Sequence, residues 1–279
     1  MKKKLGVFLI RGAGKEGSKQ QEKFVDKLNS LLRKSGVATE FIHYEYANWY
    51  LPTQSNEEKL YDRFINSGLK IKAKSLRRFV LFLISDLVAY IGEPNKPSTT
   101  YRQTHELIHK SILNLKDALE EGAPLIIIAS SLSTEIISNY IWDRQHTEDP
   151  DPLGASPFER LETLTGIFMF GNNNPIFLSA YDIDNAKPFQ FPSEKLPSDL
   201  KDAAYWGNFY DKNDPMGYPL KPVNPNYDSM VTEDVQVNSG GILLSWNAGS
   251  HLGYWKTKKI MRKVAGYIKL VLKAYSDDD

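Results

Sequence analysis

The sequence predicts an α/β protein in which helices flank a mostly parallel central sheet. Two observations lead to this prediction. Short and continuously apolar runs, of which 5–10 (LGVFLI) and 124–131 (PLIIIASS) are the clearest, are typical of strands buried on both faces. Segments with helical periodicity separate these runs along the chain, as they do where crossover helices join parallel strands.

The first half of the chain begins the alternation. A glycine-rich turn follows the first apolar run, and a helix is expected over 20–34 because Phe24 and Leu28 share one face with later leucines. Gly36 is placed to end that helix, and the segment ATEFIHY then has the composition of a strand. The elements expected in this half are strands over 5–10 and 38–44 and helices over 20–34, 79–91 and 101–121.

The second half continues the same pattern. The apolar run PLIIIASS leads directly into the helical segment TEIISNYIWD, and LTGIFMFG is a further apolar run. The elements expected here are strands over 124–131, 164–171, 205–211 and 241–246 and helices over 134–143 and 253–275. Two stretches without a clean period, 45–78 and 179–204, are interpreted as cap-like insertions into a single domain over residues 1–279.

Composition excludes several classes of protein. Lys and Arg number 35 and Asp and Glu number 34, and the resulting net charge of +1 argues against a nucleic-acid partner. The absence of cysteine excludes disulfides, thiolate metal sites and a cysteine nucleophile. The apolar run after the N-terminal lysines is interrupted by Arg11, and the segment 79–91 is shorter than the ~20 residues that span a bilayer. We therefore expect a cytoplasmic protein without a transmembrane segment.

The turn after the first strand matches the dinucleotide-binding pattern G-x-G-x-x-G over residues 12–17. In that fold, backbone amides approach a pyrophosphate, and an acidic residue at the end of the second strand binds the ribose. Glu40 has the expected distance from the glycines but lies mid-strand in the prediction, whereas Glu45 lies at the strand end but late. A tight strand-to-helix turn without any ligand explains the same glycines.

A second pattern, H-E-x-x-H, is formed by His105, Glu106 and His109. Two histidines four residues apart share a helix face and could bind zinc, with the glutamate as general base. Glu135 is a candidate third ligand by sequence distance only. A solvated amphipathic helix, whose buried side includes Leu107 and Ile108, accounts for these residues equally well.

The third pattern is a buried strand that runs through a serine-containing turn into a helix, the context of a nucleophile elbow. The elbow requires small residues two before and two after the serine, and Ala129 and Ser133 occupy these positions around Ser131. The alternative is a serine-rich helix N-cap. A serine nucleophile also requires a base and an acid, which follow in the chain order Ser, Asp or Glu, His in one hydrolase architecture.

The five histidines leave few candidates for the base. His146 follows Ser131 too soon, whereas His251 lies in a Gly/Ser loop between the last expected strand and the final helix. The acid is expected in the loop after the strand 205–211, where Asp211 and Asp214 both lie. We favour Asp214, because an Asp-Pro turn can direct a carboxylate back over the edge of the sheet.

These segments resemble the α/β-hydrolase superfamily, and in particular its bacterial lipase- and esterase-like members. The resemblance is carried by SDLVAYIG, PLIIIASSLSTEII, LTGIFMFGNNNP, WGNFYDKNDPMGYPL and SHLGYW, which together extend over nearly the whole chain. The family pattern Gly-His-Ser-Leu-Gly is replaced at the elbow by Ala-Ser-Ser-Leu-Ser, so the serine and leucine remain. The family's His-Gly-x-Gly loop reads Arg-Gly-Ala-Gly over residues 11–14.

The resemblance implies an α/β-hydrolase fold and a serine hydrolase that cleaves an ester or amide of a small molecule or lipid. Ser131 would be the nucleophile, His251 the base and Asp214 the residue that orients it. The backbone N–H groups of Ala13 and Leu132 would form the oxyanion hole, and Gly12 and Gly14 would line the substrate site. No metal or cofactor is implied. The alternative is a member of the family that has lost catalysis and only binds a ligand.

Overall fold

The central feature of the fold is one six-stranded parallel sheet. The computed structural model describes residues 2–11, 17–47, 51–91, 99–146, 156–240 and 248–276. The strands follow the spatial order β2-β1-β3-β4-β5-β6, and every neighbouring pair is parallel. Their bounds are β1 (Leu5–Arg11), β2 (Ile42–Ala47), β3 (Leu125–Ser130), β4 (Leu164–Phe170), β5 (Tyr205–Asp211) and β6 (Glu233–Val237). The predicted α/β class, with a parallel sheet flanked by helices, is confirmed.

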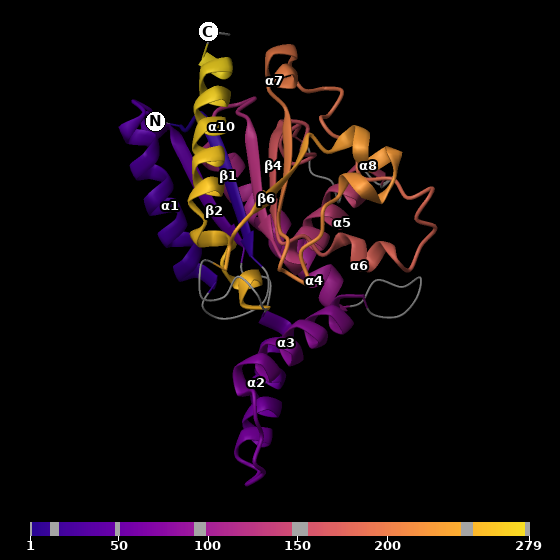
Figure 1. The fold of residues 1–279 in the computed structure, drawn as a ribbon. Helices are drawn as coiled ribbons and strands as arrows, with labels where there is room; N and C mark the ends of the chain where they lie inside the picture. Colours follow the sequence, from indigo (N-terminus) through magenta and orange to yellow (C-terminus); the bar gives the residue numbers. More distant parts are fainter. Residues whose placement is uncertain are drawn as a thin grey trace.

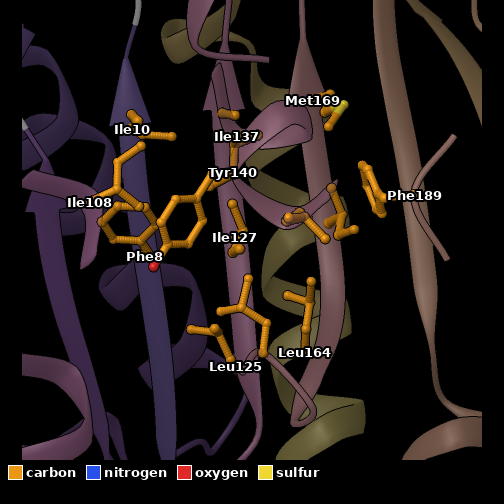
Figure 2. Close-up of a cluster of buried hydrophobic side chains, with 14 of the residues drawn as sticks. Phe8, Ile10, Ile108, Leu125, Ile127, Ile137, Tyr140, Leu164, Met169 and Phe189 are labelled. Carbon is orange, nitrogen blue, oxygen red and sulfur yellow. The ribbon is translucent and has the colours of Figure 1, made fainter. Parts of the chain in front are cut away.

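Both faces of the sheet are buried, which explains the continuous apolar runs of the central strands. Successive side chains of a strand point to opposite faces. In β1, Phe8 and Ile10 therefore belong to one hydrophobic cluster, whereas Val7 and Leu9 belong to the other. Figure 2 shows part of the first cluster. Side chains of β1, β3 and β4 pack there against side chains of the helices, including Tyr140 of α5.

Helices cover the two faces of the sheet (Figure 1). The helices α1 and α10 lie together on one face, where their apolar residues join the cluster that contains Val7. The helices α4, α5 and α8 contribute to the cluster on the opposite face. The bounds of these helices are α1 (Gly17–Lys34), α4 (Thr99–Ala118), α5 (Leu132–His146), α8 (Pro225–Met230) and α10 (Lys258–Ser276).

A helical hairpin projects from the body of the protein beyond the carboxyl ends of the strands (Figure 1). It consists of α2 (Leu51–Ile65) and α3 (Lys74–Ile91), and it occupies most of the stretch 45–78 that was expected to be an insertion. The prediction recognised α3 only from residue 79 and did not recognise α2. Over the described residues, no helix has both the length and the apolar character needed to cross a membrane.

The second expected insertion, 179–204, packs against the sheet rather than standing apart from it. Phe189 stacks on Trp206 of β5 with ring centroids 4.5 Å apart, and Phe191 approaches the same indole edge-on at 6.3 Å. The short helix α7 (Ser198–Asp202) lies within this segment, and α6 (Asn174–Leu178) lies shortly before it. The two aromatic contacts extend the core beyond the strands.

Several element boundaries differ from the prediction, and one strand of the sheet was not predicted. The strand expected over 38–44 begins only at Ile42, because residues 39–41 form a 3₁₀ turn, η1 (Thr39–Phe41). The last helix was expected from residue 253, but a separate 3₁₀ turn, η5 (Tyr254–Lys256), precedes α10. The sixth strand of the sheet is β6, which was not predicted, and the expected strand 241–246 lies outside the described residues.

The packing of α10 on the sheet depends on a glycine in β4. A Cβ added at Gly166 would overlap the ring of Tyr267, whose hydroxyl donates a 2.6 Å hydrogen bond to the carbonyl oxygen of Thr165. Because both residues are buried, we expect Gly166→Ala to lower the free energy of unfolding by roughly 1–3 kcal/mol in urea denaturation.

Gly266 provides the matched control for that measurement. A Cβ added there meets no atom within 4 Å, and the residue lies inside α10. Because alanine is the better helix former, Gly266→Ala is expected to raise the free energy of unfolding by about 0.5–1 kcal/mol. Equal stability of the Gly166→Ala variant and the wild type would contradict this account of the packing.

Candidate active site

Three loops that follow different strands meet at one edge of the sheet. The carboxyl ends of parallel strands lie at the same edge, which is where open α/β sheets bind ligands. Ser131 follows β3 directly, Asp214 lies three residues after β5, and His251 lies in the 3₁₀ turn η4 (Ala248–Leu252) beyond β6. The topology therefore brings together residues that are 120 and 37 positions apart in the chain.

The side chains of these three residues form one chain of hydrogen bonds. His251 Nε2 lies 2.8 Å from Ser131 Oγ, and His251 Nδ1 lies 2.8 Å from Asp214 Oδ2. The imidazole and carboxylate are almost completely buried, with 2% and 0% of their side chains exposed, whereas Ser131 is half-buried. A carboxylate can only accept, so His251 Nδ1–H donates to it and Nε2 is left to accept from the serine hydroxyl.

Ser131 lies in a turn with an unfavourable backbone conformation. Its φ of +57° is in the left-handed region that side chains other than glycine seldom adopt. The turn is held by a 2.9 Å hydrogen bond from Ser131 N–H to Phe170 O and by Thr134, whose N–H and Oγ1 both donate to Ser131 O at 2.8 and 2.7 Å. The strained turn and its fixed geometry agree with the description of a nucleophile elbow.

The residues around the turn explain why small side chains occupy it. Ala129 and Ser133 are fully buried where β3 and α5 approach each other. Ser130 is also buried, and its Oγ accepts a 2.9 Å hydrogen bond from Trp255 Nε1. The two neighbouring serines thus have different partners. Ser130 is hydrogen-bonded to the indole of Trp255, and Ser131 is hydrogen-bonded to His251.

Asp214 is held by donors on both of its oxygens. The hydroxyl of Tyr254 donates to Oδ2 at 2.8 Å, and the backbone N–H of Met216 donates to Oδ1 at 3.0 Å. Burial, and next the nearby Asp214, raise the pKa of Tyr254 well above its ordinary value, so this hydroxyl stays protonated and can donate. Gly217 leaves room for the arrangement, since a Cβ there would lie 2.5 Å from Asp214 Oδ2.

Asp211, the other acid considered in this loop, has a different environment. Its Oδ1 accepts from the N–H of Asn213 at 3.0 Å, and its Oδ2 accepts from the N–H of Ser239 at 2.7 Å. Burial alone would raise the pKa of Asp211, but these backbone hydrogen bonds and others from Ser239 Oγ and Gly240 outweigh it and lower the pKa. Asp211 therefore connects the loop after β5 to the segment after β6.

An asparagine-rich loop after β4 supports the site and was not recognised as part of it. Asn173 N–H donates to Thr134 Oγ1 at 3.2 Å, and Asn173 Nδ2 donates to the backbone oxygen of Met216 at 2.6 Å. The loop thereby joins the serine turn to the loop that carries Asp214. The run Gly-Asn-Asn-Asn directly after an apolar strand was the available signal, because amides are unusual next to a buried strand.

Of the four residues expected to form the oxyanion hole or to line the substrate site, the structure describes Leu132, and the other three lie outside the described residues. Leu132 is the first residue of α5, where backbone N–H groups lack an intrahelical acceptor. Gly12, Ala13 and Gly14 belong to the segment that is not described. In the sheet register, Arg11 pairs with Ser130, so the chain that continues into this segment starts beside the serine turn.

The two histidines of the H-E-x-x-H pattern are engaged with other side chains of the fold. His105 Nε2 lies 3.1 Å from the hydroxyl of Tyr90, and its Nδ1 lies 3.2 Å from Asp143. His109 Nδ1 lies 3.3 Å from the hydroxyl of Tyr140. In the described part of the chain, no group of three or more His, Asp or Glu side chains is arranged to hold a metal ion, so the zinc interpretation gains no support.

The acidic residues considered for dinucleotide binding do not favour that alternative either. Glu40 precedes β2, in the turn η1, and is not in mid-strand as predicted. Glu45 lies within β2 rather than at its end, and it accepts a 2.9 Å hydrogen bond from Asn114 Nδ2 of α4. The glycine pattern itself lies outside the described residues.

No family model, no curated protein and no solved structure that we compared with the chain matches it.

The hydrogen bonds to Asp211 lead to a prediction about stability and pH. A carboxylate whose pKa is lower in the folded state stabilises that state above its unfolded pKa of about 4, and this contribution is lost as the pH falls through the folded value. At pH 7 we expect Asp211→Asn to lower the free energy of unfolding by about 1–3 kcal/mol. The difference from wild type should shrink below pH 4, as measured by urea denaturation across this range.

Asp117→Asn on α4 is the control for this experiment, because Asp117 is exposed. Its effect is expected to stay within about 0.5 kcal/mol at every pH. A difference for Asp211→Asn that does not change between pH 7 and pH 3 would contradict the assignment.

Proposed function

We propose that the protein is a serine hydrolase of the α/β-hydrolase type that cleaves an ester or amide of a small molecule or lipid. The observation that carries the proposal is the buried hydrogen-bond chain from Ser131 through His251 to Asp214, with the serine on a strained strand-to-helix turn. Nucleophile, base and orienting acid within mutual hydrogen-bond reach are the geometric requirement for this chemistry.

The topology gives independent support. The serine follows a central strand of the parallel sheet, and the acid and base follow later strands, in the chain order Ser, Asp, His. In hydrolases of this architecture, the oxyanion is bound by the N–H after the nucleophile and by an N–H from the loop after a neighbouring strand. Leu132 meets the first condition by position, and β1, which leads to Ala13, is the direct neighbour of β3.

In the first step, the Ser131 Oγ lone pair forms a bond with the carbonyl carbon of the substrate while the hydroxyl proton moves to His251 Nε2. The carbonyl π electrons move to its oxygen, which becomes the oxyanion of a tetrahedral intermediate. The charged imidazole is stabilised by Asp214, whose carboxylate accepts from Nδ1–H. The N–H of Leu132 and the positive end of the α5 dipole would stabilise the oxyanion, and the resemblance implies Ala13 as the second donor.

The intermediate then collapses. The carbonyl re-forms, the bond to the leaving alcohol or amine breaks, and His251 gives its proton to that group. Water attacks the resulting acyl-serine by the same route in reverse, with His251 again taking a proton, and this step releases the acid and restores the hydroxyl of Ser131. The burial of the imidazole and carboxylate keeps both in one orientation throughout.

Hydrolysis of short p-nitrophenyl esters tests this proposal. We expect Ser131→Ala and His251→Gln each to lower kcat/KM by about a thousandfold or more, because either change removes the base-activated nucleophile. Asp214→Asn should lower kcat more than it changes KM, because it disturbs the tautomer of His251 and not the binding of the ester. The initial rate of p-nitrophenolate release is the measurement.

Ser133→Ala is the matched control, because it removes a neighbouring hydroxyl and keeps a small side chain at that position. It is expected to retain activity within about threefold, because alanine keeps the small side chain that this buried position beside the turn requires. If the folded wild type shows no turnover above that of Ser131→Ala, hydrolysis is refuted and the alternative of a ligand-binding member of the family is favoured.

A further inference from the structure

A large cavity lies beside α5. Its volume is about 880 Å³, within the range of roughly 300–1,000 Å³ usual for small-molecule sites. Residues of α3, α4, α5 and α6, together with the segment that follows α6, form its walls, and Trp206 and Tyr227 close it on the side of the sheet. Ser131, His251 and Asp214 are not among the described residues that line it, so the cavity is separate from the proposed catalytic chain.

The walls of the cavity are rich in aromatic rings contributed by many different elements. Tyr90 and Tyr101 stack on each other with centroids 4.9 Å apart, and Phe189 stacks on Trp206. Trp142 and Phe177 add rings from α5 and α6. Aromatic faces carry negative electrostatic potential and attract cations that lie over them.

A partly buried carboxyl group, that of Glu135, lies among these rings. Asn139 Nδ2 donates to its Oε1 at 3.1 Å. Burial raises the pKa of Glu135 to about 7, because removal from water disfavours the ionised form, although the hydrogen bond from Asn139 opposes this effect. Carboxyl groups with shifted pKa values in cavities are enriched at functional sites.

The other charged groups of the cavity leave it with an acidic excess. Asp143 accepts a 2.8 Å hydrogen bond from Tyr101 and lies 3.2 Å from His105, whereas Asp182 accepts from Asn185 at 2.7 Å. Lys187 is the one basic side chain among the described residues of the lining. Glu135 is the partly buried acid of the cavity, and among the described residues of the lining Asn139 donates to it while Tyr90 and Tyr101 lie within the range of its charge.

We propose that this cavity binds an organic cation, a protonated amine carried on an aromatic or apolar body, with its ammonium group at Glu135. Aromatic rings would hold the body, and the carboxylate would pair with the charge. Asn174 also lines the cavity, and its buried Oδ1 accepts no hydrogen bond within the described residues, while its Nδ2 donates to Ser138. This oxygen is a second acceptor suited to an ammonium N–H.

The proposal concerns a site other than the hydrolytic one and does not depend on it. Calorimetric titration of the full-length protein with 2-phenylethylammonium, with the neutral 2-phenylethanol as matched ligand, tests it. The ammonium ion should bind with one-to-one stoichiometry, and the alcohol should bind at least about tenfold more weakly. Ser131→Ala should bind the amine as tightly as wild type does, even if the hydrolase proposal fails.

The pH dependence gives the sharper test. Glu135 must be ionised to pair with the amine, so affinity should rise about tenfold between pH 6 and pH 8, as expected for one group with a pKa of about 7. Glu135→Gln should weaken binding at pH 8 and abolish this dependence. The tyrosines facing the carboxyl, Tyr90, Tyr101 and Tyr227, have pKa values raised by burial and stay neutral over this range.

Two further variants separate Glu135 from its surroundings. His105→Asn removes the histidine next to Asp143 and should keep the pH dependence, and Glu106→Gln, on the exposed side of α4, should behave as wild type. In wild type at pH 7, binding should also release protons, measured by titration in buffers of different ionisation enthalpy. Equal affinity for the amine and the alcohol, binding without proton release, or unchanged binding in Glu135→Gln would overturn the proposal.

Discussion

The buried hydrogen bond between His251 and Asp214 is the interaction on which the geometry of the candidate site depends. It joins the loops after β5 and β6, and its strength comes from the absence of competing water. Such a bond is stable only if the carboxylate is otherwise satisfied, because a buried charge without donors is costly. Tyr254 and Met216 supply those donors, and Gly217 supplies the space.

The parallel sheet makes this bond possible and then links it to the serine. Residues that follow parallel strands meet at one edge of the sheet, so three loops that are distant in sequence can contribute to the same site. Ser131 reaches the imidazole because its turn is held in the left-handed conformation by Phe170 and Thr134. The strain in the turn is therefore offset by hydrogen bonds in the same edge of the sheet.

The sequence predicted those parts of the fold and of the candidate site that leave a local pattern or allow few candidate residues. The central strands are apolar on both faces, and their positions could be predicted from continuous runs such as that of β3. Scarcity of histidine reduced the candidates for a base to His251, and chain order led to Asp214.

By contrast, β6 lies at the edge of the sheet with two buried residues, Val235 and Val237, so it lacks the pattern of a buried strand. The hydrogen bond of Tyr254 to Asp214 and the position of Glu135 in the cavity arise from tertiary contacts, and local sequence carries no signal for such contacts.

The most direct test of the central claim is covalent labelling with a serine-directed fluorophosphonate, read by mass spectrometry of the intact protein and its peptides. If Ser131 is activated by His251, the wild type should take up one equivalent on Ser131, and His251→Gln should react far more slowly. Absence of an adduct on the folded wild type, or an adduct on another residue that forms equally fast in both proteins, would contradict the account.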